Sequence, residues 1–269
     1  MAIVPPGASL KAAFRPLFRK LSHIYFHARF TAQQQAERMK YDWDRRAREN
    51  ARHFIATGQE NWTDEEFFVS GEQTVAGHIL TDMASICQGK PAGRMRVLEL
   101  GCGAGRVTRA LARIFGEVHA VDVSGEMVQL ARLALRQYPN AHVYQNNGMD
   151  LTAIPELPFD FAFSTLVFQH IPSYQIIKSY VQETNRLLVP GGLFKFQVRG
   201  NTADQSKVTD TWVGLAFSEA RAVTMARECG FEPRYRVGAG TQDFWLWFFK
   251  EGAPNVSCYN SSTSSNSPI

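Results

Sequence analysis

The sequence predicts an α/β fold in which helices cover both faces of a mostly parallel sheet. Three adjoining features predict it. An apolar run of strand length lies at Val97–Leu100, a glycine-rich turn follows at Gly101–Gly105, and the apolar residues Val107, Leu111 and Phe115 then share one helical face. Strand-like and helix-like segments alternate from there to residue 250, which is typical of sheets built from strand–helix–strand units.

The later elements follow from the same patterns. Ser124, Ser173 and Ser218 each precede a helical pattern and are typical N-caps, and Gly230 ends the last of these helices. After the first strand, the predicted strands in chain order are Glu117–Val121, Ala141–Gln145, Phe159–Ser164, Leu193–Val198, one around Tyr235, and Phe244–Lys250.

The turn after the first strand indicates the kind of ligand. Glycines let the backbone turn tightly and let a ligand lie against bare main chain, and the helix behind them offers unpaired N–H groups. The spacing is G-x-G-x-G, whereas dinucleotide-binding enzymes carry G-x-G-x-x-G. Glu99 stands just before the turn. Because a carboxylate repels a pyrophosphate and attracts an ammonium or a sulfonium, the turn favours a cationic ligand without phosphate.

The run from Glu99 to Gly105 resembles the first motif of the class I S-adenosylmethionine-dependent methyltransferases. Two further runs resemble that family, V-D-x-S-x-x-M at Val121–Met127 and L-x-P-G-G at Leu188–Gly192. The resemblance implies a seven-stranded, mostly parallel Rossmann-like sheet with helices on both faces, an antiparallel final strand and an N-terminal helical cap. It also implies S-adenosylmethionine as the cofactor and methyl transfer by in-line displacement as the reaction.

Three regions are expected along the chain. Residues 1–90 are predicted to form a helical cap or lid, residues 91–251 the S-adenosylmethionine-binding methyltransferase domain, and residues 252–269 a disordered tail rich in Ser and Asn. Within the cap, Thr31–Thr57 has the pattern of a long helix, and Ser70 is the predicted N-cap of the next one.

Cofactor contacts are expected beyond the carboxyl ends of the strands. Asp122 ends the second strand at the distance from Gly101 at which such folds place a carboxylate on ribose hydroxyls. By resemblance, Met127 lies against the adenine and Asp150 accepts from its amino group, although core packing and turn stabilisation explain these two residues as well. The predicted cofactor-binding residues are Glu99, Gly101, Cys102, Gly103, Gly105, Asp122, Val123, Met127, Met149, Asp150, Leu151, Ser164 and Thr165.

His170 follows the fourth strand and is the candidate general base, because an imidazole titrates near neutral pH. A structural histidine that holds its own loop is the alternative. The resemblance to methyltransferases makes N-terminal aromatic residues candidate walls of a substrate pocket, and packing between helices is again the alternative. The predicted substrate-pocket residues are Tyr41, Trp43, Phe68, Phe168, Gln169, Trp212 and Gln242.

Composition limits the partners. Residues 1–40 carry seven Lys and Arg against one Glu, so the formal charge of +4 is concentrated there and the remainder is slightly acidic. This argues against a large nucleic-acid surface on the catalytic part. The basic amphipathic pattern at residues 10–30 predicts a helix that packs on the main domain, with a weak membrane-surface or protein contact and a transit peptide as alternatives.

Four scattered cysteines and the lack of a signal-peptide pattern favour the cytoplasm. No His, Asp or Glu set has metal-ligand spacing, so no metal is expected. The favoured function is methyl transfer to a small molecule. A cofactor-binding scaffold or regulatory partner, recruited through the basic N-terminal segment, is the alternative. An NAD oxidoreductase fits Asp122 but neither Glu99 nor the L-x-P-G-G run. The sequence names neither the acceptor atom nor the oligomeric state.

Overall fold

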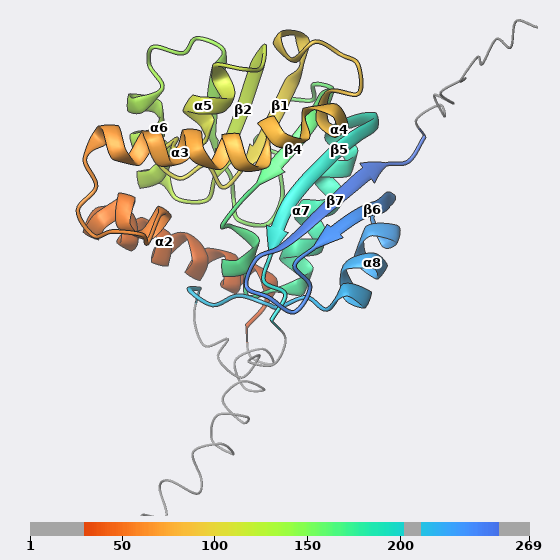
Figure 1. The fold of residues 1–269 in the computed structure, drawn as a ribbon. Helices are drawn as coiled ribbons and strands as arrows, with labels where there is room; N and C mark the ends of the chain where they lie inside the picture. The colour runs from red at the N-terminus through yellow and green to blue at the C-terminus, as the bar shows by residue number, and fades with distance from the viewer. Residues whose placement is uncertain (1–29, 202–210, 253–269) are drawn as a thin grey trace, which may run out of the picture.

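A computed structural model describes residues 30–201 and 211–252 of the chain. Its centre is one seven-stranded sheet in the order β3-β2-β1-β4-β5-β7-β6 (Figure 1). All neighbouring pairs are parallel except those that β7 makes with β5 and β6. The strands are β1 (Arg96–Leu100), β2 (Glu117–Asp122), β3 (Ala141–Gln145), β4 (Phe159–Ser164), β5 (Leu188–Val198), β6 (Phe231–Val237) and β7 (Phe244–Lys250). The predicted α/β fold, with its antiparallel last strand, is confirmed.

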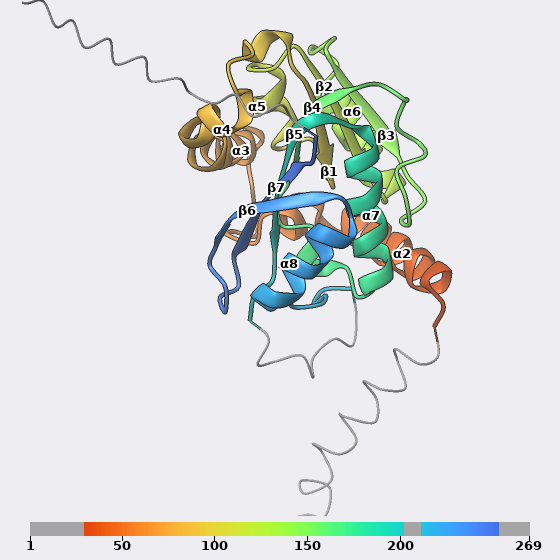
Figure 2. The same cartoon turned by 90° about the vertical axis from the view of Figure 1, so that its right-hand side faces the viewer.

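Helices cover both faces of the sheet, with α3 and α4 on one side and α7 and α8 on the other (Figure 2). Side chains along a strand point alternately to the two faces of the sheet, so apolar residues at neighbouring positions make both faces apolar. Along β1, Val97 packs under α3 and α5, whereas Leu98 and Leu100 pack into the core beside α7. The helices are α2 (Ala32–Ile55), α3 (Asp64–His78), α4 (Met83–Cys87), α5 (Thr108–Ala112), α6 (Gly125–Ala134), α7 (Tyr174–Leu187) and α8 (Glu219–Glu228), with short 3-10 turns η1 (Leu80–Asp82), η2 (Ala92–Arg94) and η3 (Phe168–His170).

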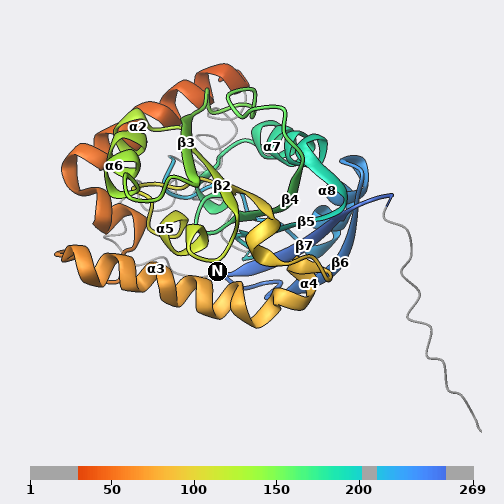
Figure 3. The same ribbon diagram turned by 90° about the horizontal axis from the view of Figure 1, so that it is seen from above.

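The N-terminal helices form the predicted cap. Helix α2 crosses the edge of the sheet where the parallel strands end, and it contacts α6 and α7 (Figure 3). Thr31 closes a capping box with Gln34 at its start, and the helix kinks at Asn50. The division of the chain at residue 90 stays a prediction. The expectations for residues 10–30 and for the tail from residue 253 lie outside the described residues.

Two boundary predictions were wrong. Ser70 is not an N-cap, because α3 already begins after Thr63, whose hydroxyl and Glu66 form the capping box. Ser70 lies inside the helix, where its hydroxyl donates to the Phe67 carbonyl. The fifth strand was predicted to begin at Leu193, after the glycine pair of L-x-P-G-G. In the structure β5 starts at Leu188 directly after α7, and the pair forms an irregularity within that strand.

Among the residues that the structure describes, no helix combines the length and apolar character that a membrane span requires.

Candidate functional site

A pocket opens at the carboxyl end of the sheet, between the strand ends and α2. Its empty space amounts to about 910 Å³ when the open solvent at its mouth is counted. Of the predicted cofactor-binding residues, those that line it are Glu99, Gly101, Cys102, Gly103, Asp122, Val123, Met127 and Thr165. Of the predicted substrate and catalytic residues, those that line it are Trp43, Phe168 and His170.

The glycine turn lies close against two other segments. Gly101 has a φ of +74°, and a Cβ there would lie 2.2 Å from a methyl carbon of Val167. Gly103 has a φ of +53°, and a Cβ there would lie 2.8 Å from the end of Ile55 in α2. Backbone N–H groups of Gly101 and Cys102 both donate to the Val121 carbonyl. The turn therefore requires glycine at both positions and is fixed to the end of β2.

Glu99 is a buried carboxylate in the pocket wall. It is 3% exposed, and its Oε2 has no hydrogen-bond partner among the described residues. Burial raises the pKa of Glu99 to about 7, although Thr108 and Arg106 oppose this. A cation that enters the pocket would therefore stabilise the ionised form of this carboxylate.

Arg106 lies beside Glu99 in the same wall and is 5% exposed. Its Nη1 donates to the hydroxyls of Thr74 (2.9 Å) and Ser70 (3.3 Å), whereas its Nε has no hydrogen-bond partner among the described residues. Burial lowers the pKa of this guanidinium, and Glu99 opposes the shift. The pocket thus contains both an acidic and a basic group that the protein itself leaves incompletely paired.

Asp122 ends β2 at the pocket. Its two carboxylate oxygens accept the backbone N–H groups of Gly103 and Ser124, both at 2.9 Å. Burial nevertheless raises the pKa of Asp122 to about 6. Each oxygen keeps a free lone pair, so the carboxylate can still accept two hydroxyl protons from a ligand.

Asn146 follows β3 and also lines the pocket. Its amide nitrogen donates to the Tyr180 hydroxyl (2.7 Å) and the Asp150 carbonyl (3.1 Å), which leaves Oδ1 buried and without a partner among the described residues. Asp150 itself does not line the pocket. Its carboxylate accepts from Thr152 and Asn147, so the structure gives it the turn-stabilising role that the sequence left open.

His170 lies at the aromatic end of the pocket. Its Nδ1 is 2.5 Å from the Trp212 carbonyl and its Nε2 is 3.1 Å from the Gln169 amide nitrogen. An Nδ1–H that donates to the carbonyl leaves the Nε2 lone pair as an acceptor. The rings of Trp43 and Trp212 lie 5.3 and 5.0 Å from the imidazole.

Helix α2 and the segment after residue 210 hold this aromatic end together. The Arg46 guanidinium lies 4.9 Å from the Trp43 ring and 5.1 Å from the Trp212 ring. It also donates to the Thr211 hydroxyl, which donates in turn to Asp42. Residues far apart in the sequence therefore build one wall, in which Phe54 contacts Trp212 edge-on.

Several predicted residues lie outside the pocket. Tyr41 is 64% exposed because it lies two residues, and so about 200° of helical rotation, from Trp43. Phe68 packs with Phe67 and under the Arg109 guanidinium and does not line the pocket. The side-chain amide of Gln242 donates a hydrogen bond to the side-chain oxygen of Gln169, and neither residue lines the pocket. The other predicted residues that do not line the pocket are Gly105, Met149, Leu151, Ser164 and Trp212.

Sequence reasoning missed part of the lining. Leu166 has a φ of +60°, rare for a branched residue, and its N–H donates to the Gln197 side chain at 3.0 Å. Its strained position directly after β4 has no signature in the sequence. The remaining missed residues include Met39, Phe54, Ile55, Arg106, Asn146 and Tyr180.

The comparisons with known proteins agree with this geometry. Residues 97–192 match the family described as methyltransferase domain. This stretch of the chain is therefore similar to known methyltransferase domains. Over 98 residues the chain is 33% identical to a ubiquinone biosynthesis O-methyltransferase of Xanthomonas oryzae, a match that covers 36% of this chain and 40% of that protein. It is 39% identical over 109 residues to a malonyl-[acyl-carrier protein] O-methyltransferase of Enterobacter lignolyticus, covering 39% and 40%.

The chain thus spans about two fifths of the length of these curated relatives. Among solved structures, magnesium protoporphyrin IX methyltransferase from Synechocystis, with bound SAH, has the same fold. The TM-score is 0.59 at 17% identity, covering 79% of this chain and 98% of the other.

Proposed function

We propose that the protein is an S-adenosylmethionine-dependent methyltransferase that methylates an oxygen of a small, partly apolar molecule. One observation carries the proposal: the pocket beside the glycine turn holds a buried carboxylate and a buried guanidinium, and one atom of each has no hydrogen-bond partner among the described residues. Buried polar groups are nearly always paired in folded proteins, so such a pair indicates a ligand that completes it.

The amino-acid end of S-adenosylmethionine fits this pair. It carries an ammonium and a carboxylate on one carbon. Glu99 supplies an acceptor for the ammonium, and Arg106 supplies a donor for the carboxylate. Because the cofactor carries no phosphate, it avoids the repulsion that Glu99 would impose on a dinucleotide.

The nucleoside end fits the neighbouring strand ends. Asp122 accepts from the two ribose hydroxyls, and the unpartnered Oδ1 of Asn146 accepts from the adenine amino group. Val123 and Met127 line the same part of the pocket and offer apolar contact to the ring. The proposal therefore transfers to Asn146 the role that the sequence analysis gave to Asp150.

The acceptor is proposed to enter at the aromatic end. When bound, the cofactor supplies an already activated methyl group, so the protein has to position the acceptor and exclude water. Trp43, Phe54 and Phe168 supply apolar walls for that purpose. The matched relatives are named as O-methyltransferases, and this supports an oxygen acceptor.

His170 is proposed to remove the acceptor proton through Nε2. The Trp212 carbonyl accepts from the Nδ1–H, so Nε2 is the basic nitrogen. The amide of Gln169 contacts Nε2 and has to give up this contact when the acceptor binds. His170→Ala should lower kcat by about 100-fold or more while the Kd of S-adenosylhomocysteine stays within twofold of wild type. A folded variant with unchanged kcat would remove His170 from the reaction.

Two measurements test the function in order. Calorimetry with S-adenosylhomocysteine comes first, on wild type, Glu99→Gln and Gln137→Ala, the last being a surface control beyond the pocket. We expect wild type and the control to bind alike and Glu99→Gln to bind at least tenfold more weakly, because a charge-assisted hydrogen bond is replaced by a neutral one. Binding of NAD without binding of S-adenosylhomocysteine would overturn the proposal.

The second measurement identifies the acceptor. Protein and methyl-labelled S-adenosylmethionine are added to a cell lysate, which is then separated into small molecules, lipid, protein and nucleic acid. Label in the small-molecule fraction supports the proposal, and label in protein or nucleic acid overturns the substrate class. Tight cofactor binding without label in any fraction favours the scaffold alternative.

A further inference from the structure

A second cluster of chemically active side chains lies at the other end of β2. Glu117 opens the strand and His119 follows two residues later, so both project from the same face. The parallel pairing of β2 with β3 sets His142 directly beside His119. Asp122, at the pocket, lies five residues beyond Glu117 and three beyond His119, about 16 and 10 Å along the strand. The cluster is therefore separate from the methyl-transfer site.

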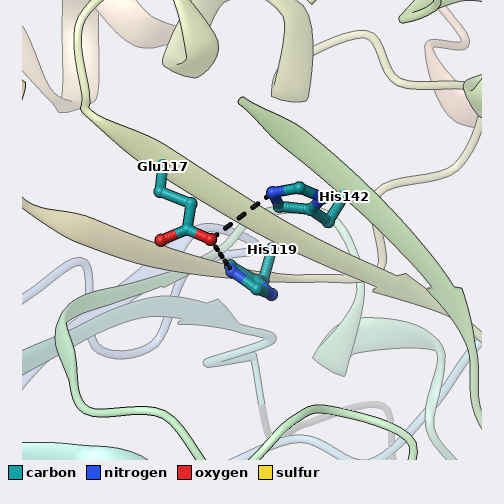
Figure 4. Close-up of side chains that lie close together, drawn as sticks. All are labelled: Glu117, His119 and His142. Atoms are coloured by element: carbon teal, nitrogen blue, oxygen red, sulfur yellow. Dashed lines mark hydrogen bonds and ion pairs between the residues drawn. The ribbon is translucent and has the colours of Figure 1, made fainter. Parts of the chain in front are cut away.

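The geometry points to a binding site for one divalent ion of the zinc class, held by Glu117, His119 and His142. The ligand atoms of the three residues all lie within 4.8 Å of one another. One carboxylate oxygen of Glu117 faces both imidazoles (Figure 4), at 2.9 Å from Nε2 of His119 and 3.4 Å from Nε2 of His142. Two imidazoles and one carboxylate form a donor set that zinc uses when it keeps an open position.

The observed spacing needs little adjustment. Zinc at about 2.1 Å from each ligand in a tetrahedron separates the ligand atoms by about 3.4 Å. The Glu117–His142 separation already has that value, and the Glu117–His119 separation is shorter by a fraction of an ångström. A small rotation of the carboxylate away from His119 opens the centre of the cluster.

Two neighbouring side chains fix the ligands as outer partners do in metal sites. The hydroxyl of Tyr144 lies 3.1 Å from Nδ1 of His119, which leaves Nε2 for the metal. Arg96 donates through Nε to the other Glu117 oxygen, Oε2, at 2.7 Å, so Oε1 alone is free to coordinate. Both contacts hold the ligand atoms toward the shared centre.

The burial of the three ligands allows an ion to enter. His119 is buried, with its ring packed edge-on to Phe159, whereas the side chains of His142 and Glu117 are 40% and 30% exposed. A fourth coordination position therefore faces solvent, where a water molecule can complete the tetrahedron. Since β3 is the last strand of the sheet, a bound ion would tie this edge strand to β2.

The direct test is zinc binding to tag-free, chelator-treated full-length protein, measured by competition with a chromophoric zinc indicator. Wild type is expected to bind one ion per chain. His142→Ala should weaken binding by at least the 10–100-fold that even an outer-shell partner contributes. His142 is the first choice for substitution because it is partly exposed, so its removal leaves the core intact. His53→Ala, which removes a part-buried imidazole on α2, is the matched control.

Thermal unfolding gives an independent readout. Zinc at 100 times the wild-type Kd should raise the Tm of wild type and of His53→Ala by about 5–10 °C. Because they bind zinc more weakly, His142→Ala and Glu117→Gln should gain no more than about half of that rise. Tyr144→Phe should retain the site with about tenfold weaker binding. Equal zinc binding by wild type and His142→Ala, or no binding by wild type, would overturn the proposal. The methyltransferase assays do not enter this test, so the two proposals stand or fall separately.

Discussion

Two carboxylates of this fold, the part-buried Asp82 and the buried Glu99, differ in how completely the protein pairs them. Asp82 accepts from Nζ of Lys195 at 2.8 Å and from Nε1 of Trp247 at 2.5 Å. Burial tends to raise its pKa, but these hydrogen bonds prevail and hold the pKa of Asp82 below its ordinary value. Glu99 has one oxygen without a partner among the described residues, and its pKa rises to about 7.

The difference distinguishes a structural ion pair, Asp82 with Lys195, from Glu99 in the pocket. Lys195 is 2% exposed in the middle of β5, and Asp82 with the His78 carbonyl satisfies it, so this pair joins the N-terminal cap to the sheet. Glu99 receives no equivalent partner from its surroundings. An unpaired buried carboxylate destabilises the free protein and is tolerated where a ligand completes it. The pairing state of a buried charge therefore indicates function better than its burial does.

The largest expected effect is on Asp82. Asp82→Asn leaves the Lys195 ammonium buried beside a neutral amide and should lower the free energy of unfolding by about 3 kcal/mol. Urea denaturation at pH 7 measures it. The double variant Asp82→Asn, Lys195→Met should recover most of the loss, because it removes the unpaired charge. If the single variant unfolds like wild type, the pair has no structural role.

Whereas Asp82→Asn should destabilise the protein, Glu99→Gln should stabilise it relative to wild type at neutral pH. The pKa of Glu99 is raised on folding, so the folded state holds this proton more tightly than the unfolded state does. Its stability contribution is fully present at low pH and is lost as pH rises toward and through 7. Between pH 5.5 and 8 wild type should lose about 2 kcal/mol more of its unfolding free energy than Glu99→Gln does. Parallel pH profiles for the two proteins would contradict this.

The pH dependence of ligand binding should also distinguish Glu99 from Asp82. In the proposed function the ammonium of S-adenosylhomocysteine meets the ionised form of Glu99, so the affinity of wild type for this ligand should rise several-fold from pH 6 to pH 7.5. Glu99→Gln should bind weakly at both pH values, without this rise. Asp82→Asn, under conditions where it is folded, should reproduce the wild-type profile. Calorimetry at the two pH values decides, and a flat wild-type profile would mean that Glu99 does not meet the ammonium.

Local sequence patterns predict most of the framework and part of the pocket. The strands are apolar runs of fixed length, and the glycine turn, Glu99 and Asp122 stand at strand ends where the chain itself places them in the pocket. Arg106 and Asn146 could not be recognised in the same way. Each is an ordinary polar residue in the sequence, and the role proposed for it rests on an atom that has no partner among the described residues.

Contacts between distant segments account for the other differences. The register of two neighbouring strands, which no local pattern specifies, brings His142 beside His119. The zinc proposal rests on this pairing and departs there from the expectation of no metal. Trp43 and Tyr41 are equivalent as aromatic residues of one helix, and only the packing of α2 against Trp212 turns the first inward. The sequence therefore shows which aromatic residues α2 carries, but only the packing of that helix determines which of them face the pocket.

The smallest effect is expected at an ion pair with nearly the geometry of the Asp82 pair but a different environment. Nζ of Lys178 lies 2.7 Å from Glu228, and the two side chains are 32% and 44% exposed. Water competes for both charges there, so Glu228→Gln should leave the urea midpoint close to that of wild type. A loss as large as that of Asp82→Asn would show that ion pairing alone, rather than burial of an unpaired charge, sets the size of the effect, and the contrast between Asp82 and Glu99 would then need another explanation.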